Sequence, residues 1–200
     1  MSAQSNKKSN KIKRRPFVAD LLSHRGDTLI VPGLGSPNWD IFAAGDSAEY
    51  LYSWGGMGLA LPTALGVALA QPRRRVLCIT GDGEIMMGIG ALAVVGDQAP
   101  SNLAILVLDN ESFAETGRQR GLTANRMDIA ATAKGFGLRE ARTVTEQGAA
   151  ADLAEFLFKT PGPVLAVAKI AITDEPWRLP EKDGGTITHR FRVALGIEKT

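Results

Sequence analysis

Unbroken apolar runs separated by stretches of helical character constrain the fold of this chain more than any other feature. Three of them are RRVLCIT (74–80), LAILVLD (103–109) and GPVLAVAKIAI (162–172), and a shorter one, DTLIVPG (27–33), precedes them. Strands without polar alternation are buried on both faces, which is typical of a parallel sheet covered by helices on either side. The sequence therefore predicts an α/β protein with three layers, α/β/α, around a mainly parallel sheet.

The segments between these runs predict helices over residues 63–70, 85–98, 126–137, 143–160 and 187–196. No internal repeat or low-complexity linker interrupts the pattern, so we expect a single domain over residues 16–200. Residues 1–15 include the polar, basic stretch NKKSNKIKRR and are expected to form a disordered, solvated tail. No basic or aromatic stripe follows it, so a nucleic-acid-binding arm is not favoured.

The composition excludes several classes of protein. A net charge of +2 over 200 residues gives no argument for nucleic acid, and the single cysteine, Cys78, excludes disulfides, cysteine-based zinc sites and iron–sulfur clusters within the chain. Residues 50–72 carry no charge, yet their glycines and Pro62 argue against a membrane span. The N-terminus lacks the apolar core of a signal peptide, and we expect a cytoplasmic protein.

Two predicted strands end in acid-bearing turns, Gly81-Asp82-Gly83 and Asp109-Asn110-Glu111. The intervening residues, 84–109, are one helix plus one strand, so a right-handed crossover brings the two turns side by side. A helix N-terminus favours phosphate, whereas Asp82 repels it, and a Mg²⁺ ion between them satisfies both. Asn110 and the backbone carbonyl of Ser112 are further candidate oxygen ligands. Taken singly, a residue such as Asp82 is more often a helix cap than a metal ligand, and one such as Asn110 is more often a turn residue.

The combination resembles a known family. The sequence GDG, followed by 26 residues and DN, is similar to the diphosphate-binding signature of thiamine diphosphate (ThDP) enzymes, although Asp109 replaces the first of their two usual asparagines. The segments at 53–70 and 115–119 are also similar to the decarboxylase branch of that family. The resemblance covers roughly residues 31–194 and is strongest to the decarboxylases of sulfopyruvate and phosphonopyruvate. It implies a ThDP-binding fold and a diphosphate-binding (PP) domain.

The resemblance also implies roles for individual residues. Asp82, Asn110 and the Ser112 carbonyl would bind Mg²⁺. The Gly55 carbonyl would accept a hydrogen bond from the aminopyrimidine, and Met57 would support the bent cofactor. The complete set implied to contact ThDP is Gly55, Met57, Gly81, Asp82, Gly83, Glu84, Asn110, Ser112 and Phe113. Glu84 is unusual beside a diphosphate unless its carboxylate turns away or caps its own helix.

By the same resemblance, the Glu that activates the cofactor lies on a separate pyrimidine-binding domain, for which this chain has no room. The catalytic residue is therefore expected on a partner (α) chain, in an α₂β₂ or larger assembly, and the isolated chain should show little decarboxylase activity. The resemblance implies a small anionic 2-oxo acid as the substrate. Arg118 and Arg120 are candidates to face its second anion, with solvated surface charges as the alternative interpretation.

Other functions remain open at this stage. ThDP intermediates are also trapped by a second carbonyl, so a carboligase subunit of the acetolactate-synthase or benzoylformate-decarboxylase type is an alternative. A catalytically inert ThDP-binding regulatory subunit is another. A ferredoxin oxidoreductase chain would bring more cysteines than Cys78. A nicotinamide site is disfavoured because Gly33-Leu34-Gly35 lacks the third glycine at the required spacing.

Overall fold

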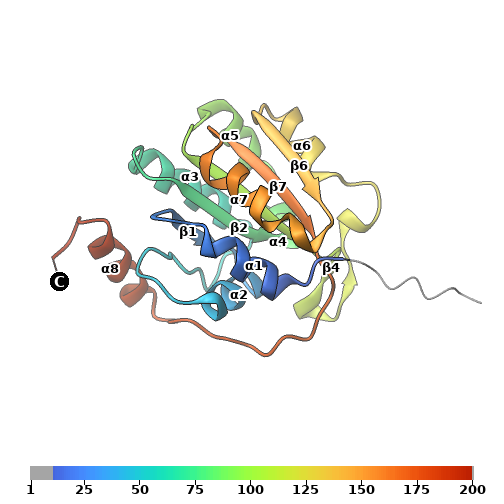
Figure 1. Cartoon of the computed structure of the whole chain (residues 1–200), viewed down its shortest axis with the longest axis horizontal. Helices are drawn as coiled ribbons and strands as arrows, with labels where there is room; N and C mark the ends of the chain where they lie inside the picture. The colour runs from blue at the N-terminus through green and yellow to red at the C-terminus, as the bar shows by residue number, and fades with distance from the viewer. Residues whose placement is uncertain (1–10, 200) are drawn as a thin grey trace, which may run out of the picture.

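The computed structural model describes residues 11–199, which form a five-stranded parallel sheet flanked by helices (Figure 1). The strand order is β1-β2-β3-β7-β6, with bounds β1 Leu29–Pro32, β2 Val76–Gly81, β3 Leu103–Asp109, β7 Val164–Lys169 and β6 Glu140–Val144. Every neighbouring pair is parallel; Val76, for example, lies between Leu29 and Leu103. This topology confirms the predicted α/β fold with a mainly parallel sheet.

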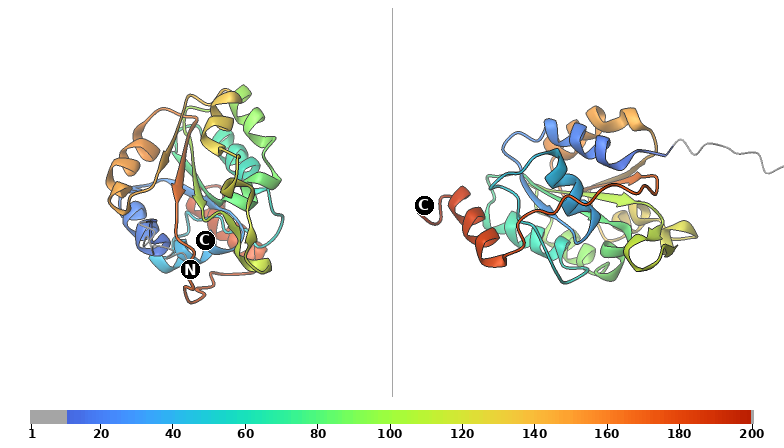
Figure 2. Two further views of the ribbon diagram at one scale, coloured as in Figure 1. Left: turned by 90° about the vertical axis from the view of Figure 1, so that its right-hand side faces the viewer. Right: turned by 90° about the horizontal axis from the view of Figure 1, so that it is seen from below.

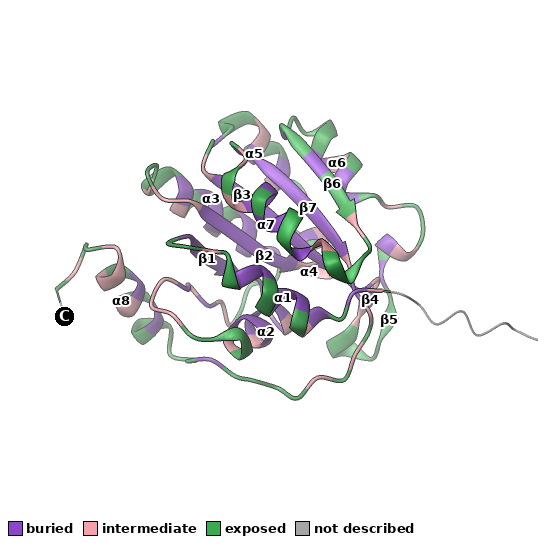
Figure 3. Ribbon diagram, viewed as in Figure 1, coloured by how far each residue is buried: buried purple, intermediate pink, exposed green. Residues whose placement is uncertain are grey.

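Helices cover both faces of the sheet. Figure 2 shows the two helical layers, and their bounds are α1 Arg14–Ser23, α2 Ser36–Ala44 and α7 Ala150–Lys159 on one face, and α3 Ala60–Ala70, α5 Ala91–Gln98 and α6 Ile129–Gly135 on the other. Successive strand residues alternate between two apolar cores. Leu77 and Ile79 pack under the first layer, whereas Val76 and Cys78 pack under the second. This double burial explains the unbroken apolar runs of the central strands (Figure 3).

Short elements surround the carboxyl ends of the strands. Helix α4 (Asp82–Met87) follows β2 directly, and β4 (Ser112–Phe113) pairs with β5 (Gln119–Arg120) in a small hairpin after β3. Residues 11–199 also contain three 3₁₀ turns, at Ala114–Thr116, Leu122–Ala124 and Gln147–Ala149. An extended segment over residues 171–183 leads from β7 to α8 (Gly184–Ala194), which lies at the opposite end of the molecule from the hairpin (Figure 1).

The start of the chain differs from the expected disordered tail. Residues 1–10 lie outside the described residues, but the prediction was wrong for residues 11–15. Ile12 is fully buried and forms a bridge with Ile170, and α1 begins at Arg14. The buried Arg14 guanidinium donates to the Asp40 carboxylate, which also accepts from Arg15 at 3.0 Å. These arginines pair with a buried acid on α2 instead of facing water.

Two predicted helices were partly wrong. The helix expected over 85–98 starts at Asp82 and is broken at Gly88–Gly90 into α4 and α5, because Gly88 packs directly against the backbone of Gly58. The segment 143–160 begins inside the edge strand β6, and its helix starts only at Ala150. Only Ala141 of β6 is buried, as expected for an edge strand, so β6 has no unbroken apolar run by which it could be predicted. Helix α2 was also missed.

The uncharged segment 50–72 forms a loop followed by the eleven-residue helix α3. Within residues 11–199, every helix is too short or too polar to cross a bilayer.

Candidate functional site

A cavity of about 140 Å³ lies where β2 and β3 end, between α4, the start of α2 and the β4–β5 hairpin. Eight of the nine residues predicted to contact a cofactor line it: Met57, Gly81, Asp82, Gly83, Glu84, Asn110, Ser112 and Phe113. The remaining lining residues are Leu34, Ser36, Pro37, Leu108, Ala114, Glu115 and Thr116. The two turns meet because β2 and β3 are hydrogen-bonded neighbours, with Gly81 at the end of β2 paired with Leu108, one residue before the end of β3.

Asp82 is buried at the first position of α4, and its surroundings do not support a simple capping role. The N-cap position is Gly81, and no side chain caps this helix. The Thr123 hydroxyl lies 3.2 Å from Asp82 Oδ2 and 2.8 Å from Asp109 Oδ1, so it bridges two buried carboxylates. Burial, followed by the neighbouring charge of Asp109, raises the pKa of Asp82 to about 6. A buried acid that has a raised pKa and does not cap its helix is typical of a functional residue.

Asn110 and Ser112 form the second wall of the cavity. The Asn110 side-chain oxygen accepts a hydrogen bond from the Ser112 amide at 2.8 Å, which closes the turn after β3. Glu111 between them adopts a left-handed φ of 63°, so the turn is tight. The Ser112 hydroxyl donates to the Gln119 carbonyl at 3.2 Å and ties the turn to β5. A carbonyl oxygen has two lone pairs, so Asn110 serves the turn and retains capacity for a cation.

Asp109, which stands where the family signature has Asn, has its own partner. The Lys169 ammonium on β7 donates to Asp109 Oδ2 at 2.6 Å and to Glu111 Oε1 at 3.0 Å, and Lys11 donates to Glu111 Oε2 at 2.7 Å. Asp109 is fully buried, so a cation opposite it is an electrostatic requirement. The prediction missed Lys169, although the replacement of Asn by Asp was the signal that such a partner exists.

The carboxylate of Glu84 turns away from the cavity. Its Oε1 accepts from the backbone amides of Gly58 at 3.0 Å and Ala60 at 3.1 Å, and its Oε2 accepts from the Thr80 hydroxyl. Burial raises the pKa of this carboxyl group, and the two amides oppose that effect. Glu84 therefore caps α3 instead of its own helix, and only part of the residue borders the cavity.

The loop before α3 carries the remaining candidates. Met57 lines the cavity and is 41% exposed, whereas Gly55 is exposed and does not border it. The Phe113 ring packs against the Gly81-Asp82-Gly83 turn; a Cβ atom on Gly83 would stand 2.9 Å from this ring. Glycine at 83 is therefore required by the packing of this aromatic side chain. The role of Gly55 toward an aminopyrimidine stays a prediction.

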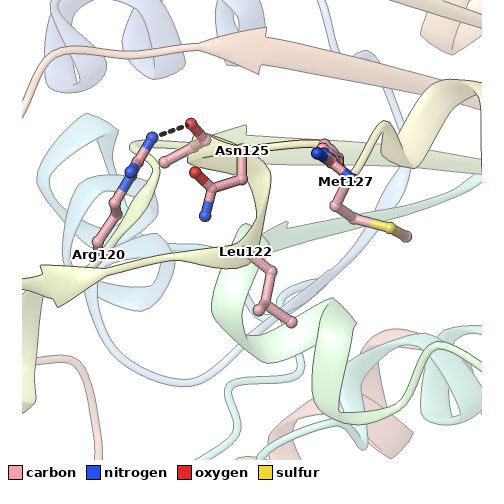
Figure 4. Close-up of a pocket in the computed structure, with 6 residues that line it drawn as sticks. Arg120, Leu122, Asn125 and Met127 are labelled. Atoms are coloured by element: carbon pink, nitrogen blue, oxygen red, sulfur yellow. Dashed lines mark hydrogen bonds between the residues drawn. The ribbon is translucent and has the colours of Figure 1, made fainter.

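Arg118 and Arg120 do not border this cavity. The Arg118 guanidinium donates to the Asp174 carboxylate, and the side chains of Arg118 and Asp174 are both well exposed. The Arg120 guanidinium donates to the Ala124 carbonyl at 2.7 Å and faces a separate open depression of about 830 Å³ (Figure 4). That depression is lined by Arg120, Leu122, Ala124, Asn125, Arg126 and Met127. Its residues provide no group that is buried or positioned for catalysis.

The charges around the cavity restrict what it can bind. Among the described residues that line it, three are acidic (Asp82, Glu84 and Glu115) and none is basic. A diphosphate alone would be repelled by Asp82, and the α4 amides are weak compensation for two phosphate charges. A divalent cation on oxygen ligands removes this conflict, because it binds Asp82, Asn110 and phosphate together. The donor set therefore fits a magnesium diphosphate.

The sequence is similar to known decarboxylases. It is 39% identical over 116 residues to sulfopyruvate decarboxylase subunit beta from Methanothermobacter thermautotrophicus, covering 58% of this chain and 62% of that protein. It is 37% identical over 139 residues to phosphonopyruvate decarboxylase from Streptomyces viridochromogenes, covering 70% of this chain and 34% of that protein. The chain thus spans less than two thirds of the length of these relatives.

Solved structures of ThDP-dependent enzymes have a similar fold. A putative thiamin diphosphate-dependent enzyme from Mycobacterium smegmatis superimposes with a TM-score of 0.71 at 22% identity, over 82% of this chain and 32% of that one. The 4-hydroxybenzoylformate decarboxylase of Rhodococcus jostii RHA1 gives a TM-score of 0.69, also at 22% identity, over 83% of this chain and 34% of that one. Residues 41–168, more than half of the chain, match the family described as thiamine pyrophosphate enzyme, C-terminal TPP binding domain. The chain belongs to this family of ThDP-binding domains.

Proposed function

We propose that this chain is the β-type subunit of a ThDP- and Mg²⁺-dependent 2-oxo acid decarboxylase of the sulfopyruvate or phosphonopyruvate type. It binds the diphosphate half of the cofactor, and a separate pyrimidine-binding chain completes the active site. The observation that carries this proposal is the acidic cavity at the ends of β2 and β3. Its buried Asp82 and the adjacent Asn110 suit a diphosphate only together with a divalent cation.

Each lining residue has a distinct role in this proposal. Asp82, Asn110 and the Ser112 carbonyl bind Mg²⁺, and the amides at the start of α4 face the diphosphate. Met57 supports the cofactor from the opposite side. When bound, ThDP supplies a carbon nucleophile that attacks the substrate ketone and accepts the electron pair left by CO₂. The protein orients this group and excludes water from it.

The proposal includes a separate chain that supplies the pyrimidine-binding half of the site. The chain matches only about a third of phosphonopyruvate decarboxylase, at 34% of its length. Three relatives carry the name subunit beta, which implies a second subunit in those enzymes. An α₂β₂ or larger assembly agrees with this division of the site between chains.

The first test is cofactor binding by the purified chain. Equilibrium dialysis should show ThDP binding that requires Mg²⁺ and is lost with EDTA, and thiamine without phosphates should bind far more weakly. The second test is CO₂ release from sulfopyruvate and phosphonopyruvate. The isolated chain should release little, and a pyrimidine-binding chain added in trans should restore turnover. Cation-independent ThDP binding, or robust turnover by the isolated chain, would contradict the proposal.

A carboligase is the second candidate, and one comparison favours it. The chain is 35% identical over 126 residues to acetolactate synthase isozyme 1 large subunit from Escherichia coli. Both reactions release CO₂, so the reconstituted complex must be assayed for its organic product. An aldehyde supports the decarboxylase, and a 2-hydroxy ketone formed with a second carbonyl compound supports the carboligase.

A further inference from the structure

We infer that Glu84 is a positioning residue that couples the diphosphate-binding turn to the loop carrying Met57. This inference rests on the proposed function, because it assigns the two connected segments to one cofactor. Glu84 lies in the first turn of α4, directly after the Gly81-Asp82-Gly83 turn. Its carboxylate reaches the loop before α3, 24 to 26 residues earlier in the chain, instead of the cavity.

The contacts of Glu84 replace a missing helix cap. The first amides of any α-helix lack partners within the helix. In α3 the N-cap position is Leu59, whose side chain offers no acceptor, and no side-chain cap is present at that position. Glu84 Oε1 instead accepts from the amides of Gly58 and Ala60, at 3.0 and 3.1 Å. The start of α3 therefore depends on a side chain from α4.

A third contact fixes the carboxylate itself. The Thr80 hydroxyl, at the end of β2, donates to Glu84 Oε2, and Glu84 is only 4% exposed. The side chain thus joins three segments: the end of β2, the first turn of α4 and the start of α3. Hydrogen bonds to a buried carboxylate are charge-assisted and stronger than those between neutral groups.

Close backbone packing reinforces the same junction. A Cβ atom on Gly88 would lie 2.3 Å from the Gly58 carbonyl oxygen, so the chain at the end of α4 packs closely against the loop before α3. Gly58 has a φ of +88°, which disfavours side chains there. Met57 directly precedes Gly58 in the chain and lines the cavity. Movement of α4 must therefore move Met57 as well, and the two walls of the cavity are mechanically linked.

The test compares Glu84→Ser with Glu84→Gln in the full chain. Serine is too short to reach the amides, whereas Gln retains an oxygen that accepts from them. Without cofactor, hydrogen exchange at the Gly58 and Ala60 amides should become about tenfold faster in Glu84→Ser, as expected for loss of a charge-assisted hydrogen bond. Glu84→Gln should restore most of the protection. Asp128→Ala, which removes the cap of the distant helix α6, is the control and should leave these two amides unchanged.

The second measurement reports on the cofactor. With Mg²⁺ present, ThDP affinity should fall about tenfold in Glu84→Ser, by the same free-energy reasoning, and the circular dichroism of the bound cofactor should change. Glu84→Gln should recover both the ThDP affinity and the circular dichroism.

Two results would overturn the inference. The first is unchanged hydrogen exchange in Glu84→Ser, and the second is faster exchange with unchanged ThDP affinity and circular dichroism. Absence of ThDP binding by the unmodified chain would instead refute the proposed function, and the cofactor-free exchange would still decide whether Glu84 fixes the loop. If Glu84→Ser does not fold, Thr80→Val removes one of the three contacts and should show the same changes at smaller size.

Discussion

Replacing Asp82 by Asn should stabilise the metal-free chain and abolish cofactor binding. The carboxylate is buried, and its pKa is raised from 3.8 to about 6 by burial and by Asp109. A raised acid pKa means that the folded state penalises the charged form. At about 1.4 kcal/mol per pKa unit, the penalty at neutral pH is about 3 kcal/mol at most. Asparagine keeps the shape, carries no charge, and its amide can donate to Asp109.

The sign of the effect depends on pH. The penalty is complete above the folded pKa of about 6 and vanishes below the unfolded value of 3.8. With EDTA at about pH 7.5, Asp82→Asn should raise Tm by at most roughly 6–12 °C, since a chain of this size gains about 2–4 °C per kcal/mol. Near pH 4 the two proteins should melt together. The assay is differential scanning calorimetry at both pH values.

The same substitution distinguishes a metal ligand from a helix cap. Adding Mg²⁺ and ThDP should raise the Tm of the unmodified chain by mass action and leave Asp82→Asn unchanged. Asn and Asp cap helices about equally well, so a capping residue would show no change in stability or in ThDP binding. Asp128→Asn, at the genuine N-cap of α6, is the matched control and should be neutral in both assays. Equal ThDP affinity in Asp82→Asn would refute the proposed site.

Three further predictions concern the surroundings of the cavity. Lys169→Met should lower the free energy of unfolding by about 3 kcal/mol, because it leaves Asp109 buried without its cation. Adding Asp109→Asn should recover most of this stability, as measured by urea unfolding. Gly88→Ala places a methyl group against the Gly58 carbonyl and should cost about 1–3 kcal/mol by overpacking, with weaker ThDP binding; unchanged Tm and affinity would refute the close contact. Arg120→Ala should leave Mg²⁺ and ThDP affinity unchanged in equilibrium dialysis, because its guanidinium contacts Ala124 outside the cavity; a large loss would contradict that placement.

The sheet and the meeting of its two polar turns were predictable from the sequence. Strands β2 and β3 are buried on both faces, so their sequences are unbroken apolar runs. The helical connection between them, which forms α4 and α5, favours a neighbouring parallel pair. The edge strand β6 was not predictable by the same signal, because its exposed face is polar. Likewise, the residues 11–15 are basic in composition, but the buried acid that pairs with Arg14 lies on α2, far away in sequence.

Most residues that line the cavity could be named from the sequence, but the orientation of their side chains could not. The spacing of the two turns placed Asp82 and Asn110 at one cavity, since the chain connection fixes their positions. The direction of Glu84 depends instead on the uncapped start of α3, and that of Arg118 depends on Asp174 in the segment after β7. Such pairings arise from tertiary packing, which local patterns do not encode.

The most direct test of the central claim is a crystal structure of the chain with ThDP and Mn²⁺, using the anomalous scattering of manganese to locate the ion. The account predicts a single strong peak at the cavity, about 2.1–2.3 Å from the Asp82 carboxylate and the Asn110 side-chain oxygen, and in contact with the cofactor diphosphate. A diphosphate bound there without a cation, or a manganese ion bound away from both side chains, would contradict it.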